Sequence, residues 1–331
     1  MANNFIAFNL EGPLSPQDSA AELMKLFPSG DKIYIVISRY RELKGSGEEG
    51  GREPDHILSL IIPFLVLHKI QEDQIIGSAA NAPVTGGAAN LISQLEYNSW
   101  KIFCLTSACE QYALHFTHQF GIYAHHTIST PLPLNEMIRT ADKKALDLIL
   151  QTEREMQGLT TGSDDLIIKR KLEAFYGEEL PQTNLGPYLN LVKPPGSQRK
   201  LEALKDLAAR FDQPLSGWVM IGSGLEDVPA LQAVNRAGGL AIAFNADKAA
   251  LSSSLLAMAS TSIADFLDVA LTWQKGGLRA TERLVREKER IGGRGQRGHF
   301  HWLPGKADIS PVIEIHQRLN LLTEEEAAKA R

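Results

Sequence analysis

The sequence predicts an α/β fold of three layers, in which helices cover both faces of a largely parallel sheet. Short apolar runs at residues 5–8, 100–105, 218–221 and 240–244 have the length and composition of strands buried on both faces. Helical patterns separate these runs. Between residues 218 and 244 a strand, a tight turn, a helix and a second strand follow one another closely. That rhythm favours parallel strands, because a helix returns the chain across the sheet between them.

Each expected element starts or stops at a local signal. Ser15 and Pro16 place a proline at the first helical position after a serine cap, a frequent helix start. Gly238 and Gly239 are typical of a helix stop. In chain order we expect a strand at 5–8, helices over 15–98, a strand at 100–105, helices over 135–156 and 163–176, a helix over 200–211, a strand at 218–221, a helix over 228–237, a strand at 240–244 and one long helix from about residue 262.

The expected elements divide the chain into a core and three additions. The Rossmannoid core takes residues 1–14, 99–130 and 190–270. A helical cap insert occupies residues 15–98, a second helical insert residues 131–189, and a C-terminal helical tail residues 271–331. A chain of 331 residues is long enough for one large domain with such inserts.

The composition excludes several classes of protein. Apolar residues make up 44% and charged residues 22% of the chain, and the formal net charge is -5, as in an ordinary soluble globular protein. This balance gives no drive towards nucleic acid or an anionic membrane. The apolar run at 57–67 is too short to span a bilayer, and the start of the sequence lacks the basic segment of a signal peptide. Cys104 and Cys109 are not expected to form a structural disulfide, and a cytoplasmic location is the expectation.

Polar side chains follow the expected strands where they end. The carboxyl ends of parallel strands meet at one edge of a sheet, where ligands of such folds bind. The residues at this edge are Asn9, Glu11 and Gly12 after the first strand, Thr106 and Ser107 after the second, Lys200 at a helix start, and Ser223 and Asp227 after the third strand.

This order and spacing resemble the four motifs of the haloacid dehalogenase (HAD) superfamily. In an active member an aspartate attacks phosphorus, a second acid donates and accepts protons, a Ser or Thr and a Lys bind the phosphoryl oxygens, and acids of the fourth motif hold Mg²⁺. The resemblance implies that Asn9 stands at the nucleophile, Glu11 at the acid and base, Gly12, Thr106 or Ser107 and Lys200 at the phosphate-binding positions, and Asn9, Glu11, Ser223 and Asp227 at the Mg²⁺ site.

A closer resemblance covers residues 5 to about 247, including the helical inserts. Residues 8–15, 63–65, 106–113 and 227–234 are similar to an archaeal-type family described as subunit R of energy-converting hydrogenase A. Members of that family carry Asp where Asn9 and Ser223 stand here. They tend to have acidic residues after the tyrosine that matches Tyr40, where this chain has Arg41-Glu42.

Asn9 and Ser223, which stand where the family has Asp, predict a site that has lost its catalytic activity. A carboxamide is a poor nucleophile, so Asn9 cannot form an aspartyl-phosphate. Asn9 and Ser223 also remove two anionic ligands from a Mg²⁺ site, which is possible but weakened, with Asp227 and Glu226 remaining. Taken one at a time, Asn9 would be a turn residue, Lys200 an ordinary lysine at a helix start and Ser223 part of a plain turn, so only the set carries the interpretation.

Two further patterns are weaker. His115 and His118 have a spacing that binds zinc, but surface or capping histidines are the more frequent case. The tail carries a row of arginines interleaved with glutamates, followed by a Gly/Arg-rich segment at 292–298 and the aromatic run at 299–302. The last has the composition of a nucleic-acid contact, which is too short to support one, and its aromatic residues would equally dock the tail onto the core.

We therefore expect a catalytically degenerate HAD-like protein that binds a small phosphorylated or anionic ligand, or a partner protein. One alternative is an active Mg²⁺-dependent phosphohydrolase in which Glu11 activates water directly. The other is a structural or assembly subunit that docks through its tail, as the hydrogenase resemblance suggests. Membrane and nucleic-acid partners are not expected.

Overall fold

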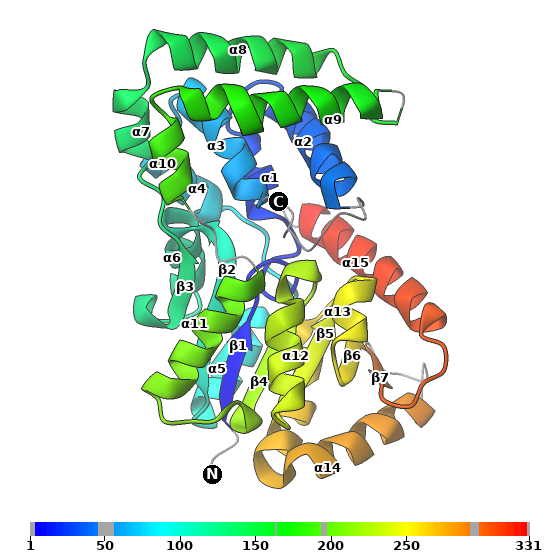
Figure 1. Ribbon diagram of the computed structural model, residues 1–331. Helices are drawn as coiled ribbons and strands as arrows, with labels where there is room; N and C mark the ends of the chain where they lie inside the picture. The colour runs from blue at the N-terminus through cyan, green and yellow to red at the C-terminus, as the bar shows by residue number, and fades with distance from the viewer. Residues whose placement is uncertain (1–3, 46–55, 163, 193–196, 292–297, 330–331) are drawn as a thin grey trace.

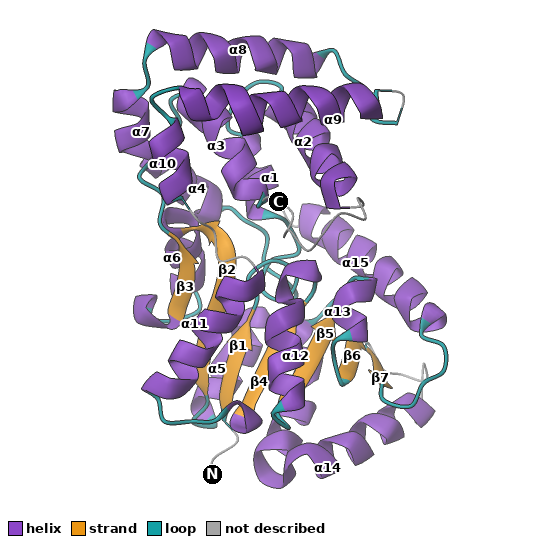
Figure 2. Cartoon of the chain, in the orientation of Figure 1, coloured by secondary structure: helices purple, strands orange, loops and turns teal. Residues whose placement is uncertain are grey.

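A seven-stranded sheet runs through the lower half of the molecule, and a layer of helices lies above it (Figures 1 and 2). The computed structural model describes residues 4–45, 56–162, 164–192, 197–291 and 298–329. The strand order is β3-β2-β1-β4-β5-β6-β7, with β1 to β6 parallel and β7 antiparallel to β6. The strands are β1 (Phe5–Phe8), β2 (Lys101–Cys109), β3 (Thr127–Thr130), β4 (Trp218–Gly222), β5 (Leu240–Phe244), β6 (Leu256–Ala259) and β7 (His299–Trp302).

Both faces of the sheet are buried at its centre, which explains why β1, β4, β5 and β6 are continuously apolar. In β1, Ile6 and Phe8 pack into one hydrophobic cluster, whereas Phe5 and Ala7 pack into the other. Successive side chains of a strand point to opposite faces, so a strand with two buried faces has no polar positions. The sequence-based prediction of a three-layer α/β sandwich is confirmed.

Helices cover the sheet from both sides. Residues of α11, α12, α13 and α15 share a cluster with one face, and residues of α5, α6 and α14 share a cluster with the other. Figure 1 shows α11 and α12 in front of the sheet and α5 behind it. The bounds are α5 (Ala88–Tyr97), α6 (Glu110–His118), α11 (Ser197–Arg210), α12 (Val228–Arg236), α13 (Lys248–Ser252), α14 (Leu267–Ile291) and α15 (Ser310–Lys329).

The helical layer above the sheet, which we call the cap, draws its helices from both inserts. Helix α2 packs on α8 and α9, and α3 packs on α7 and α8, so the inserts expected over 15–98 and 131–189 form one structure. Figure 1 shows this layer across the carboxyl ends of the central strands. Of the helices in the two inserts, α5 covers the sheet. The cap consists of α1 (Ser19–Met24), α2 (Gly30–Gly45), α3 (Ile57–Leu67), α4 (Glu72–Ala80), α7 (Leu134–Thr140), α8 (Lys143–Gln157), α9 (Asp165–Ala174) and α10 (Gly186–Leu191).

Two helix boundaries differ from the sequence prediction. Helix α1 begins at Ser19 rather than at Pro16, because the Asp18 carboxylate caps it by accepting the Ala20 N–H. The helix expected over 135–156 is broken in two, since Asp142 adopts extended backbone and caps α8. Local capping by a carboxylate therefore decides both starts.

The segment expected as a helical tail contains a strand. β7 pairs with β6, and Phe300 and Trp302 are buried in the core cluster. The interpretation that these aromatic residues dock the tail onto the core is therefore correct, and residues 299–302 complete the sheet. Residues 292–297 of the Gly/Arg-rich segment lie outside the described residues.

Other sequence expectations concern the surface and the cysteines. In the described residues, no helix is both long enough and apolar enough to cross a bilayer. Cys104 and Cys109 are buried free thiols. His115 and His118 are exposed on α6, and among the described residues no three His, Cys, Asp or Glu side chains gather as a metal site would require.

Candidate functional site

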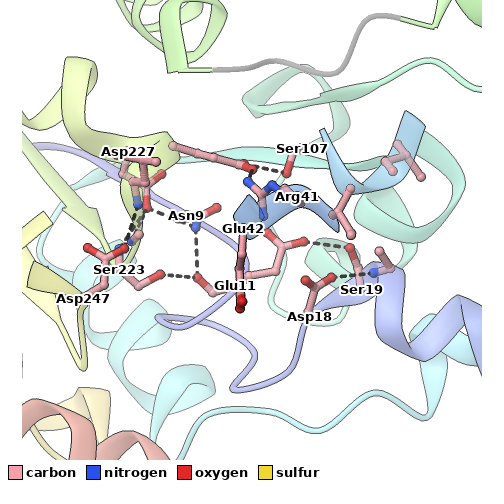
Figure 3. A pocket seen from close by; sticks show the side chains of 16 residues that line it. Asn9, Glu11, Asp18, Ser19, Arg41, Glu42, Ser107, Ser223, Asp227 and Asp247 are labelled. Atoms are coloured by element: carbon pink, nitrogen blue, oxygen red, sulfur yellow. Dashed lines mark hydrogen bonds and ion pairs between the residues drawn. The ribbon is translucent and has the colours of Figure 1, made fainter. Parts of the chain in front are cut away.

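The polar residues that the sequence places at strand ends come together beneath the cap. Asn9 follows β1 directly, and its N–H donates to the Ile221 carbonyl of β4. Lys200 lies in the first turn of α11, and Asp227 closes the short η5 turn (Leu225–Asp227) after β4. Figure 3 shows Asn9 between Asp227 and Glu11. Because β1 and β4 are neighbouring parallel strands with aligned register, their carboxyl ends lie side by side.

The Asn9 carboxamide joins three groups of the site. Its Nδ2 donates to the Glu11 carbonyl at 3.0 Å and to Asp227 Oδ2 at 3.2 Å. Its Oδ1 accepts from Lys200 Nζ at 3.3 Å. These partners fix the orientation of the amide, because the reverse orientation would face N–H groups towards an ammonium and an oxygen towards a carboxylate. Both amide hydrogens are thus used inside the site.

Lys200 and Asp227 form a buried ion pair. Their side chains are 1% and 0% exposed, and Lys200 Nζ donates to Asp227 Oδ1 at 2.9 Å. Burial alone would lower the pKa of Lys200, but Asp227, Glu226 and Glu11 outweigh it and raise that pKa to about 12. Asp227 Oδ2 also accepts the backbone N–H of Ser223 at 2.8 Å. Lys200 is therefore a fixed positive charge at the floor of the site.

Glu11 is held by hydroxyl groups. Its Oε1 accepts from Ser19 at 2.7 Å and its Oε2 from Thr106 at 2.9 Å. Burial raises the pKa of Glu11, as does the nearby Asp18, although Lys200 and Ser19 act in the opposite direction. The Thr106 hydroxyl also accepts the Ala108 N–H, so its proton and one of its two lone pairs are engaged within the protein.

Gly12 and Ser223 shape the loop between these groups. Gly12 has a φ of +92°, and a Cβ added to it would lie 2.6 Å from Ser223 Oγ, so the turn requires glycine. Its N–H donates to the Ser15 carbonyl at 2.6 Å. Ser223 Oγ donates to the Glu11 carbonyl at 3.0 Å. The Gly12 N–H is thus engaged in its own turn, away from the position expected for a phosphate.

The donor set does not fit a resident Mg²⁺ ion. Mg²⁺ needs oxygen lone pairs in a near-octahedral arrangement, usually with carboxylates among them. Here the Glu11 carbonyl and Asp227 Oδ2, two oxygens that such an ion would share, accept hydrogens from Asn9 and Ser223. Lys200 neutralises the same carboxylate. Hydrogen bonds and an ammonium therefore satisfy the acceptors that a divalent cation would need.

A second set of contacts surrounds Glu226. Its Oε1 pairs with the Arg41 guanidinium and lies 3.5 Å from His56 Nδ1. Its Oε2 accepts from Ser107 Oγ at 3.1 Å and lies 3.9 Å from Lys200 Nζ. Burial opposes ionisation, but His56, Lys200 and Arg41 hold the pKa of Glu226 well below its ordinary value. These contacts join the cap to the core.

A cavity of about 610 Å³ opens between the cap and the core. Its wall is apolar at Ile57, Leu58 and Leu225 and mostly polar or charged elsewhere. Burial raises the pKa of Asp18, which caps α1 and accepts from Tyr34 at 2.7 Å. The other lining residues are Asn9, Glu11, Ser19, Ala20, Arg41, Glu42, Ser107, Ser223, Gly224, Glu226, Asp227 and Asp247.

Sequence reasoning missed the contribution of the cap to the site. Arg41 comes from α2 and His56 precedes α3, and no motif marks either as a site residue. The only signal was the unusual Arg41-Glu42 pair after Tyr40. The strand-end residues Asn9, Glu11, Thr106, Ser107 and Asp227 are brought together as expected, together with Lys200 and Ser223.

Comparison with known proteins identifies the fold of this chain. No protein-family model and no curated protein matches the chain. A solved structure of a gene product from Archaeoglobus fulgidus is similar to it with a TM-score of 0.79 and 18% identity, over 98% of this chain and 97% of that one. A phosphoserine phosphatase carrying a phospho-aspartyl intermediate analogue aligns with a TM-score of 0.51 and 12% identity, over 81% of this chain and 99% of that one.

A substrate-bound phosphoserine phosphatase aligns similarly, with a TM-score of 0.51 and 13% identity, over 80% of this chain and 97% of that one. Identities this low establish shared architecture and leave chemistry to the site itself. Together with the strand order, these likenesses show a HAD-like Rossmannoid fold with helical cap inserts.

Proposed function

We propose that this chain is a catalytically degenerate HAD-like protein that binds a small phosphorylated or otherwise anionic molecule in the cavity beneath its cap. The Asn9 carboxamide carries this proposal. It stands where the fold would place a nucleophilic carboxylate, and its two N–H bonds and one acceptor bond are all used within the protein. An uncharged amide held in this way cannot attack phosphorus.

The test is a gain of function. Wild-type protein is expected to be silent towards a generic aryl phosphate with Mg²⁺. The double variant Asn9→Asp/Ser223→Asp restores the two carboxylates and should gain turnover by about tenfold or more over the wild-type background. Adding Lys200→Ala to it should abolish that gain, because the phosphoryl charge then loses its buried ammonium. Wild-type turnover that depends on Lys200 would refute the degeneracy.

A second candidate rests on Glu11. Its carboxyl lines the cavity and its pKa is raised, chiefly by burial, which suits a group that accepts a proton from water. In that case Glu11 would activate water directly, and turnover of the wild type would be lost in Glu11→Gln. Thr106→Val serves as the matched control, because it removes the hydroxyl that bonds Glu11 and leaves the carboxyl in place.

The third expectation, assembly through the tail, gains no specific support. Phe300 and Trp302 face the core, and α15 packs against β6. No surface for a partner protein is located among the described residues, whereas the small ligand proposed here has the cavity beneath the cap to enter.

A further inference from the structure

Four groups that bind anions surround a single carboxylate in this protein. Arg41 and His56 approach Glu226 from the cap, and Ser107 and Lys200 approach it from the core. Each carboxylate oxygen of Glu226 therefore faces one group at hydrogen-bond distance and one further positive or protonatable group. Guanidinium, ammonium and hydroxyl groups arranged in this way are typical of sites that recognise phosphates and carboxylates.

We propose that the Glu226 carboxylate is a built-in anion that occupies the binding site for the terminal oxyanion group of a ligand. This inference rests on the proposed function, since it names how that cavity receives its ligand. The ligand displaces Glu226, and its phosphate or carboxylate takes over the contacts with Arg41, Ser107 and Lys200. Affinity in the wild type is therefore weak, because the ligand competes with an anion already attached to the site.

The geometry leaves room for the exchange. Glu226 lines the cavity and its side chain is 18% exposed, so rotation about its side-chain bonds can carry the carboxylate outward. Leu225, the preceding residue, is 50% exposed, and η5 is a single short turn. The apolar wall at Ile57 and Leu58 then faces the organic part of the ligand.

Charge balance explains why the site is filled when no ligand is bound. An arginine and a lysine brought together without an anion would repel each other, and partly buried charges without partners are costly. Asp227, Glu226 and Glu11 supply the counter-charge of Lys200, and Glu226 supplies that of Arg41. A negative ligand would replace the Glu226 counter-charge, whereas a neutral one would leave Arg41 without it.

A purely structural link between cap and core is the competing interpretation, and one substitution separates the two. Glu226→Gln keeps the size of the side chain and removes its charge. Isothermal titration with inorganic phosphate should then show affinity raised by about tenfold or more over the wild type. Glu42→Gln is the matched control: it removes a carboxylate that lines the same cavity but pairs with Arg39, and should change affinity by about twofold at most.

Adding Arg41→Gln to Glu226→Gln should remove the gain. Acetate, titrated in parallel, identifies the anion: a gain for both anions assigns a general oxyanion site, and a gain for phosphate alone assigns a phosphate site. A folded Glu226→Gln variant without any gain overturns the proposal. If that variant does not fold, the wild type provides the test. Phosphate at millimolar concentration should raise its Tm, Arg41→Gln should lose the rise, and no rise overturns the proposal.

Inorganic phosphate is not a substrate for hydrolysis, so this result is independent of turnover. Wild-type activity on an aryl phosphate would refute the degenerate function and leave the displacement of Glu226 standing. No turnover of aryl phosphate, together with no gain in phosphate affinity in Glu226→Gln, would overturn the displacement of Glu226 and leave the degenerate function standing.

Discussion

At the residue scale, Lys200 and Asp227 form an ion pair in which each partner depends on the other. Both side chains are buried, and the ammonium is the counter-charge of the carboxylate. Lys200→Met should lower the free energy of unfolding by about 3–5 kcal/mol, because it leaves Asp227 buried without its counter-charge. Lys200→Met/Asp227→Asn should recover part of that loss. Urea unfolding measures both, and equal stability of the single and double variants would contradict the pairing.

Asn9 and Ser223 permit a test by metal addition. In Asn9→Asp/Ser223→Asp two carboxylates join Asp227, so their mutual repulsion should lower Tm in the absence of divalent ions. Mg²⁺ at millimolar concentration should restore it by several degrees, on the order of 1–2 kcal/mol. Wild type should show no such rise, because Asn9 and Ser223 hydrogens occupy the shared acceptors. A Mg²⁺-dependent rise in wild-type Tm would contradict the assignment of these hydrogens.

The sequence predicts which side chains meet at the site where their positions at strand ends decide the contact. Asn9 and Glu11 lie just after β1, and Asp227 closes the short turn after β4. Parallel pairing of β1 with β4 makes their meeting a consequence of register. Arg41 and His56 reach the site only because cap helices from distant parts of the chain pack together. Such contacts leave no periodic pattern in the sequence, so they cannot be predicted from local sequence.

At the element scale, α15 is fixed to the sheet by a buried histidine. His316 is 0% exposed, and its Nδ1 accepts the Ala246 N–H at 2.9 Å. Burial, with smaller contributions from His301 and His299, lowers the pKa of His316 to about 3. The unfolded chain therefore binds a proton more readily, and stability is lost as pH falls below about 6.5 towards about 3.

The resulting prediction concerns the pH dependence of unfolding. Between about pH 7 and about pH 5, the part of the unfolding free energy due to His316 should fall by about 2 kcal/mol. His316→Asn keeps an acceptor without a titrating ring, so its stability should vary less over this range. His118→Asn, on the exposed side of α6, should follow the wild type. Parallel pH profiles for wild type and His316→Asn would count against the buried neutral imidazole.

The elements themselves divide into those that the sequence specifies locally and those that it does not. The strands β1, β2, β4 and β5 were predicted because each is a continuous apolar run. β7 alternates His299, Phe300, His301 and Trp302, a pattern with one buried face that lies next to a Gly/Arg-rich segment. Its role depends on pairing with β6, from which α14 and further residues separate it along the chain.

On the scale of the whole molecule, the two inserts act as one cap. Contacts of α2 with α8 and α9 and of α3 with α7 and α8 close the cavity over the strand ends. The sequence divided these residues into separate inserts, because β2, α6 and β3 lie between them along the chain. Spatial merging of distant segments is a tertiary property, which hydrophobic periodicity does not specify.

The C-terminal segment belongs to the same folded unit as the core. Trp302 is 4% exposed and packs in the cluster that includes β5 and β6, and α15 contributes Val312 to the opposite face. Trp302→Ala should therefore lower the free energy of unfolding by about 3–5 kcal/mol through the cavity it leaves. Leu321→Ala changes a residue of α15 that is 60% exposed, and should change stability by about 0.5 kcal/mol or less.

A separately folded appendage would behave differently, because unfolding of residues 271–331 would leave the core intact. Denaturant unfolding of Trp302→Ala, followed by far-ultraviolet circular dichroism and by tryptophan fluorescence, distinguishes the two cases. A single transition, coincident for both probes and shifted to lower denaturant, is expected of one cooperative unit. Two transitions, with the main one unmoved, would show that the tail folds apart from the core. Truncation before β7 would then become a usable test of assembly through the tail, whereas in a cooperative unit it would expose β6 and unfold the domain.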